Sequence, residues 1–107
     1  MAVLVNGYSA SAAELFTSAL KDHKMATVVG EKTFGKGCGQ NVITLPDGSG
    51  LSFTTFLYDP PFSPNYNGVG ITPDVEAHLS EEAMQKNLFD LPHSEDDQLK
   101  AALEVLK

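Results

Sequence analysis

The hydrophobic residues of the first thirty positions follow three patterns in succession. Residues 2–5 form an uninterrupted aliphatic run, which is typical of a buried strand. Residues 11–22 then place apolar side chains at the spacing of one buried helical face, namely Ala12, Leu15, Phe16, Ala19 and Leu20. A second aliphatic run follows at residues 26–30. This order predicts a β-α-β unit with two parallel strands, and therefore a mixed α/β fold.

The middle of the chain is expected to hold a loop and a β-hairpin. Three glycines fall within the five positions 35–39, so residues 33–40 are too flexible for a helix or a regular strand. Residues 41–45 and 51–58 are rich in β-forming residues, and a Pro-Asp-Gly turn separates them. This pattern predicts a hairpin.

The last half of the chain is more polar and less regular. Three prolines between residues 59 and 67 predict an irregular segment, followed by a short extended stretch that ends at Ala77. Residues 80–87 form a weak helix candidate. A firmer final helix is expected after Ser94, which can cap it, because one apolar face recurs at Leu99, Ala102, Leu103 and Leu106.

Composition limits the classes of function. The chain has 107 residues, which suits one domain or part of one. All seven basic residues are lysine, and fourteen acidic residues give a formal net charge of −7, which argues against a nucleic-acid partner. No apolar run approaches the roughly 20 residues that span a bilayer. The single cysteine, Cys38, excludes an internal disulfide.

Two residues could carry chemistry. Ser11 precedes the first helix and has Glu14 three positions later, which is the capping-box pattern. A serine at a helix N-terminus is also well placed as a nucleophile, because free N–H groups stabilise an oxyanion. Lys36 lies in the glycine loop, where a lysine is usually solvated, and it becomes a general base only where burial lowers its pKa. The local pattern therefore leaves Ser11 open as a cap or a nucleophile, and Lys36 as a solvated side chain or a general base.

The remaining candidates carry weaker signals. Cys38 could be a nucleophile, but no histidine lies close to it in sequence. The spacing of His23, His78 and His93 indicates neither a metal site nor a catalytic triad, so we interpret them as surface residues.

Three segments together resemble a known family in order and spacing. They are Asn6-Gly-Tyr-Ser-Ala-Ser-Ala-Ala-Glu14, Val29-Gly-Glu-Lys-Thr-Phe-Gly-Lys-Gly37 with Gln40, and Gly70-Ile-Thr-Pro-Asp-Val-Glu76. They are similar to the C-terminal processing peptidases, also called tail-specific proteases, which are serine peptidases of the S41 type. The resemblance covers residues 2–78. It implies a crotonase- or Clp-protease-like core of β-β-α units, a polypeptide substrate, no cofactor or metal, and a cell-envelope or secreted location.

The resemblance also assigns roles by position. It implies that Ser11 is the nucleophile, that Lys36 is the general base, and that Gln40 orients the lysine. The backbone N–H of Ala12 would help to hold the oxyanion. Two departures from the family pattern, at Ala13 and Gly39, fall on positions without a catalytic role. We therefore expect the Ser11 hydroxyl and the Lys36 amine to lie about 3 Å apart.

The resemblance covers only part of the family's length. We expect residues 1–78 to be the C-terminal part of a catalytic domain and residues 79–107 to be an acidic helical tail. The family's PDZ module and upstream core are absent from these residues, so we expect the chain to be inactive alone and to form homo-oligomers through exposed core strands. The rival hypothesis is a non-catalytic module of the same ancestry that binds a peptide along a sheet edge.

Overall fold

The computed structural model describes the backbone of residues 1–107 and every side chain except that of Leu88. Strand β1 (Ala2–Val5), helix α1 (Ala12–Asp22) and strand β2 (Thr27–Gly30) form the predicted β-α-β unit. β1 and β2 pair in parallel, with Val3 opposite Val28, as the sequence predicts. The short strand β5 (Val75–Glu76) pairs in parallel with the other edge of β2, so the sheet order is β1-β2-β5.

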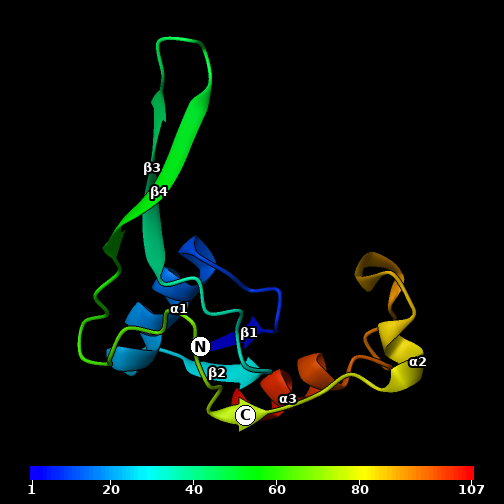
Figure 1. The fold of residues 1–107 in the computed structure, drawn as a ribbon. Coiled ribbons are helices and arrows are strands. Elements are labelled where there is room, and N and C mark those ends of the chain that lie inside the picture. Colours follow the sequence, from blue (N-terminus) through cyan, green and yellow to red (C-terminus); the bar gives the residue numbers. More distant parts are fainter.

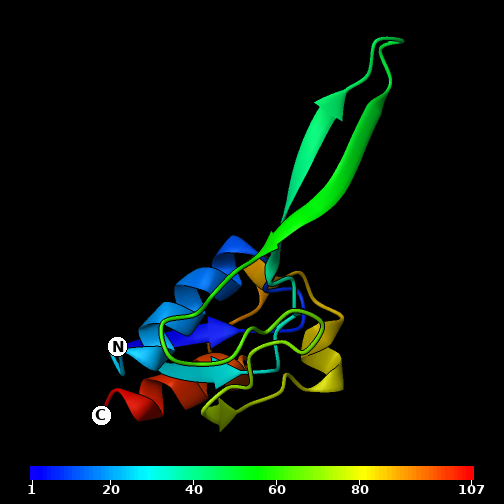
Figure 2. The ribbon, with the colours of Figure 1, turned by 60° about the vertical axis from the view of Figure 1, so that its left-hand side comes forward.

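Helices cover both faces of this sheet (Figure 2). α1 lies on one face, and α3 (Asp97–Val105) lies on the other, where it contacts β1 and β2. Val5, Val28 and Val29 are therefore buried. The expectation that these strands expose their apolar faces is wrong for these three residues, because the C-terminal helix supplies the missing cover; Leu4 alone remains 45% exposed.

A long hairpin projects from this body (Figure 1). β3 (Cys38–Thr44) pairs antiparallel with β4 (Gly50–Leu57), which confirms the predicted hairpin. β3 begins three residues earlier than expected, inside the glycine-rich segment. The ring of Phe56 lies over Gly39, where a Cβ atom would come within 2.0 Å of it, so glycine permits the pairing rather than preventing it.

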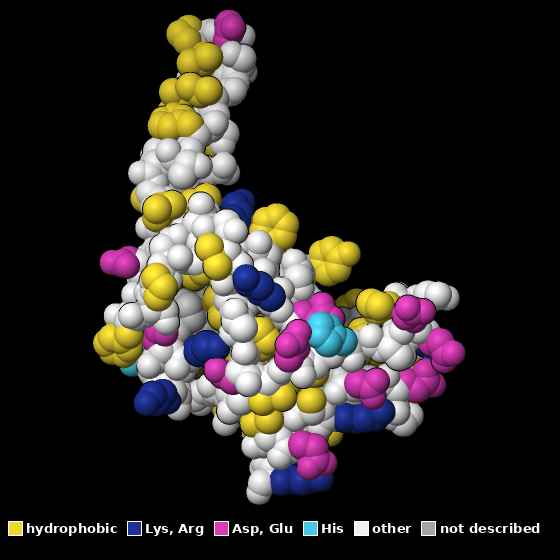
Figure 3. Space-filling model, turned by 60° about the horizontal axis from the view of Figure 1, so that its bottom comes forward, with side chains coloured by type: hydrophobic (Ala, Val, Ile, Leu, Met, Phe, Trp, Pro, Cys, Tyr) yellow, Lys and Arg dark blue, Asp and Glu magenta, His cyan; other side chains and the backbone are white. Residues whose placement is uncertain are grey.

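The hairpin has one apolar and one polar face. Its register places Ile43 opposite Leu51 and Asn41 opposite Phe53, whereas Val42 faces Ser52 and Gln40 faces Thr54. The apolar side chains follow one side of the arm in Figure 3. All residues of β4 are exposed. The arm therefore carries a continuous row of exposed apolar side chains, in addition to single exposed ones on the body such as Phe16 and Phe34.

The tail is less helical than expected. α2 (Glu81–Met84) is a single turn capped by Ser80, and a 3-10 turn follows at Leu88–Asp90. Asp96 caps α3, since its side chain accepts a hydrogen bond from the Leu99 amide at 2.9 Å. The prediction of Ser94 as the cap is therefore wrong by two residues.

Candidate active site

Ser11 follows a tight turn at the carboxyl end of β1. The Asn6 carbonyl accepts from the Ser9 amide at 2.9 Å, and the Asn6 amide donates to the Ser9 hydroxyl at 3.1 Å. The Ser9 carbonyl in turn accepts from the Phe34 amide at 3.0 Å. Ser9 therefore has a structural role, because it closes the turn and ties it to the segment that carries Lys36.

The backbone of Ser11 is strained. Its backbone dihedrals are φ 55° and ψ −115°, a combination that residues with a Cβ atom rarely adopt. The other two helix caps, Ser80 and Asp96, have the extended conformation that is usual at this position. Strain of this kind persists only where surrounding contacts impose it, and it is concentrated at functional sites. This conformation favours the nucleophile over the ordinary cap.

Glu14 is the centre of the site, although the sequence pattern indicated only a capping role for it. Its side chain is 0% exposed. Its carboxyl group accepts four hydrogen bonds: from the Ser11 amide (2.9 Å), the Lys36 amide (2.8 Å), the Gly35 amide (2.6 Å) and the Thr33 hydroxyl (2.5 Å). A buried carboxyl group needs such partners to offset its loss of water. Glu14 thus links the start of α1 to residues 33–37, the loop that carries Lys36 (the lysine loop).

One oxygen of Glu14 brings the two candidate catalytic residues together. Oε2 accepts from both the Ser11 amide and the Lys36 amide, so these two nitrogens lie no more than the combined hydrogen-bond length of 5.7 Å apart. The Ser11 side chain is half-buried and the Lys36 side chain is exposed. The backbones are adjacent, and the expected 3 Å between hydroxyl and amine stays a prediction.

Gln40 and Ala12 lie on the two elements that flank this pair. Ala12 is the first residue of α1, where amide N–H groups have no partner within the helix. Gln40 is exposed in β3, at the point where the register shifts. Their predicted roles, in the oxyanion hole and in orienting Lys36, stay predictions.

The other titratable candidates lie elsewhere. His23, His78 and His93 are exposed, as predicted. Hydrogen bonds to Glu31 and then to Glu76, each 3.0 Å long, raise the pKa of His78. No group of three or more metal-ligating side chains occurs among the described residues, and no helix among them is long and apolar enough to cross a membrane.

Tyr66 is a buried residue next to the lysine loop. Burial, followed by the nearby charges of Glu14 and Tyr58, raises its pKa to about 12. Its ring packs against Gly37, where an added Cβ atom would lie 3.0 Å from the ring. Tyr66 thus fills the space behind the loop and leaves no room there for a larger residue.

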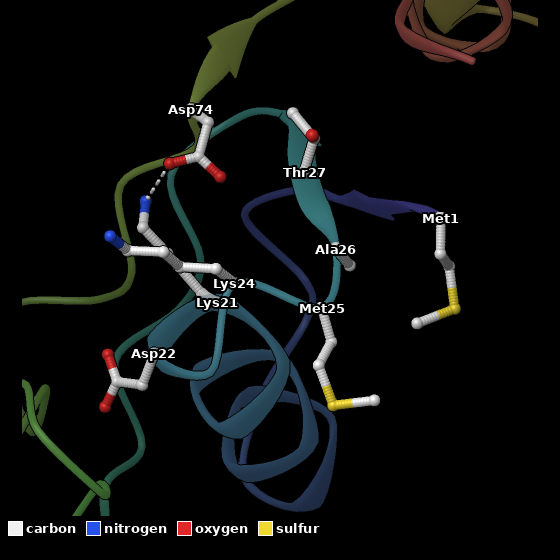
Figure 4. Close-up of a pocket in the computed structure, with 8 residues that line it drawn as sticks. All are labelled: Met1, Lys21, Asp22, Lys24, Met25, Ala26, Thr27 and Asp74. Atoms are coloured by element: carbon white, nitrogen blue, oxygen red, sulfur yellow. Dashed lines mark ion pairs between the residues drawn. The ribbon is translucent and has the colours of Figure 1, made fainter.

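A separate cavity of about 550 Å³ lies at the other end of α1 (Figure 4). Lys21 and Asp74 form an ion pair of 2.9 Å on its wall. Burial acts to raise the pKa of Asp74, but hydrogen bonds from Lys21 and the Val28 amide outweigh it and lower the pKa. The 11 residues of α1 place this cavity about 16 Å from Ser11. It is therefore separate from the Ser11 site.

Known proteins match this chain over most of its length. The sequence pattern of peptidase family S41 matches residues 1–77. A carboxy-terminal-processing protease of Bartonella bacilliformis is 48% identical over 73 residues, which are 68% of this chain and 17% of the relative. A carboxyl-terminal-processing protease of Synechocystis sp. is 41% identical over 108 residues, 99% of this chain and 24% of the relative.

A solved structure is similar in sequence and fold. It is the photosystem II D1 C-terminal processing protease, with a TM-score of 0.68 and 42% identity, covering 84% of this chain and 23% of that one. The chain thus spans less than a quarter of the length of these relatives. The Synechocystis match also extends the similarity into residues 79–107, beyond the segments that carry the resemblance.

Proposed function

The chain belongs to peptidase family S41, and from that premise we propose that it carries the nucleophile and the general base of a C-terminal processing endopeptidase. Its substrate is a polypeptide, as membership of a peptidase family implies. The observation that carries the proposal is the shared acceptor: one oxygen of Glu14 holds the backbones of both Ser11 and Lys36.

The proposed reaction is acyl transfer through a Ser/Lys dyad. Neutral Lys36 takes the proton of the Ser11 hydroxyl while the serine oxygen attacks the peptide carbonyl. The resulting oxyanion is stabilised by the amide N–H of Ala12 and by the positive end of α1. Lys36 then gives its proton to the leaving amine, and the acyl-enzyme forms. Water, deprotonated by Lys36, releases the acid product.

Two further residues support the dyad in this proposal. Gln40 orients the Lys36 amine, and Glu14 fixes the backbone from which both side chains extend. The strained backbone of Ser11 supports its role, since a simple cap has no need of that conformation. The rival hypothesis of a non-catalytic binding module is not favoured, because the relatives described above are named as proteases.

We further propose that residues 1–107 hold the dyad but not the whole active site. Residues 1–78 would be the C-terminal part of the catalytic domain and residues 79–107 its acidic tail. The length of the relatives supports this division of the site. Cleavage of a peptide also needs further donors for the oxyanion and groups that position the substrate, which the dyad alone does not supply. The chain alone would then cleave no unstructured protein substrate.

We also propose that the chain self-associates, now through the hairpin. Its apolar face carries Phe53, Leu51 and Ile43, all at least 42% exposed. Such a surface rarely stays uncovered in solution.

A fluorophosphonate probe tests the dyad directly, because it reacts with an activated serine. The expected result is labelling of Ser11, lost in Ser11→Ala and in Lys36→Met. Lys32→Met is the matched control, since Lys32 is another exposed lysine of the same segment. Equal labelling of the Lys36→Met and Lys32→Met variants would overturn the role of Lys36 as base.

A further inference from the structure

The glycine-rich loop around Lys36 is held from two sides. Glu14 binds the amides of Gly35 and Lys36 from the side of α1. The opposite side faces residues 65–69, which lie outside the three segments that carry the resemblance. The Gly68 amide donates to the Gly35 carbonyl at 2.8 Å. The flexibility expected from the glycines is thus restricted by contacts on both sides.

Two asparagines bind the peptide groups that follow Lys36. The side-chain oxygen of Asn67 accepts from the Gly37 amide at 3.1 Å. The side-chain nitrogen of Asn65 donates to the Gly37 carbonyl at 3.0 Å and also to the Tyr58 carbonyl. The Tyr58 amide donates to the same Gly37 carbonyl at 2.8 Å. Both the amide and the carbonyl of Gly37 are therefore bound.

The two asparagines also hold each other. The backbone amide of Asn67 donates to the Asn65 side-chain oxygen at 2.8 Å, so that the two residues form one unit. This unit is anchored to the body of the protein through Asp22, whose carboxylate accepts from the Phe62 and Ser63 amides at 2.8 and 2.9 Å. The position of the Gly37 peptide is therefore set by α1, through residues 62–67.

We propose that Asn65 and Asn67 are positioning residues for Lys36: they fix the backbone after the lysine, as Glu14 fixes it before. This inference rests on the proposed function, in which Lys36 must reach Ser11. A displacement of about 1 Å in a reacting group can lower a rate by about a hundredfold. A glycine on each side of Lys36 would otherwise leave its backbone free to move.

The hydrogen-bond directions give the two positions opposite requirements. Asn67 uses only its side-chain oxygen as acceptor, which an aspartate reproduces. Asn65 uses its side-chain nitrogen as donor to two carbonyls, which an aspartate cannot do. Asn67→Asp and Asn65→Asp add the same charge two residues apart. They therefore form a matched pair that separates the hydrogen bonds from general effects of charge.

The test is amide hydrogen exchange of residues 1–107, followed by NMR. Asn67→Ala is expected to speed exchange of the Gly37 amide about tenfold, the change that one hydrogen bond of typical strength produces. Asn67→Asp should restore the original rate. Asn65→Asp should speed exchange at Tyr58 and Gly37. Exchange in β2, at Val28 and Val29, should stay unchanged in each variant and shows that the fold is intact.

The rate of Ser11 labelling by the fluorophosphonate probe gives the second readout. It should fall at least tenfold in Asn67→Ala and Asn65→Asp, and should return in Asn67→Asp. Equal behaviour of the two aspartate variants, or unchanged Gly37 exchange in Asn67→Ala, would overturn the positioning role. If the unaltered chain fails to label while the exchange pattern holds, the proposed chemistry of Ser11 is in error and the hold on the loop stands.

Discussion

Replacing Ser11 by glycine should stabilise the protein relative to replacing it by alanine. Both variants remove the hydroxyl group, so they differ only in the Cβ atom. At φ 55° and ψ −115° that atom clashes with the neighbouring backbone, whereas glycine adopts the conformation freely. The comparison therefore isolates the strain that the backbone of Ser11 carries.

The expected gain is the difference between two effects. A residue held in a sparsely populated backbone region carries about 1–3 kcal/mol of strain. Glycine loses more conformational freedom on folding, which costs it roughly 0.5–1 kcal/mol against alanine. The middles of the two ranges differ by about 1 kcal/mol, so Ser11→Gly is expected to be more stable than Ser11→Ala by about that amount. At about 4 °C for each kcal/mol, Tm should be higher by roughly 4 °C.

Urea unfolding of both variants, followed by circular dichroism, measures this difference. Ala12→Gly is the control, because Ala12 has the ordinary backbone of a first helical residue and should lose up to about 1 kcal/mol. Both Ser11 variants should also lose labelling by the fluorophosphonate probe. If Ser11→Gly is no more stable than Ser11→Ala, the backbone is not strained and the argument from strain to function is refuted.

Three more predictions concern Glu14, His78 and the hairpin. Glu14→Gln replaces an acceptor oxygen by a donor that faces backbone N–H groups, so stability should fall by roughly 2–3 kcal/mol in urea unfolding and Ser11 labelling should be lost; an unchanged midpoint contradicts this. Because its pKa is raised in the folded state, His78 stabilises the protein fully below the unfolded value of about 6.5, and this contribution disappears as pH rises through the folded value. His78→Gln should therefore reduce the free energy of unfolding in urea at pH 5.5 but not at pH 8.5, and an equal loss at both pH values contradicts this. Sedimentation should show self-association that Phe53→Thr weakens and Thr54→Ala, on the polar face, does not; a monomer at high concentration would exclude the association.

Local pattern was sufficient to predict the β-α-β unit and the hairpin. In both, the type of element follows the hydrophobic period and the turn residues. The predicted buried face of α1 is wrong, however, because Leu15 and Phe16 are 39% and 62% exposed, and the polar residues Glu14, Thr17 and Ser18 are buried instead. The errors occur where a contact between residues far apart in the sequence determines the bounds or the burial of an element. The start of β3 depends on Phe56 covering Gly39, and the cover on β1 and β2 comes from α3 at the far end of the chain. Ser94 and Asp96 both fit a cap by residue type, and only the geometry distinguishes them.

The candidate site shows the same difference between residues found from local pattern and residues brought in by distant contacts. The resemblance supplied Ser11, Lys36 and Gln40, but the pattern Ser-x-x-Glu indicated only a cap for Glu14. Its bonds to Thr33, Gly35 and Lys36 span 19 to 22 residues of sequence, a separation that no local spacing reveals. The asparagines that hold Gly37 lie 28 and 30 residues from it, in a segment whose prolines suggested only irregular structure.

These contacts fix the backbone of Ser11 and of the lysine loop rather than the side chains of Ser11 and Lys36. Lys36 has a long, flexible side chain, and ordering it costs roughly 2 kcal/mol of conformational entropy. Glu14 holds the peptide before Lys36, and the peptide of Ser11, through one oxygen. Movement of the lysine loop therefore breaks the same carboxyl network that binds the amide of Ser11. The stability of that network and the relative position of Ser11 and Lys36 are consequently coupled, so a variant that loosens one should loosen the other.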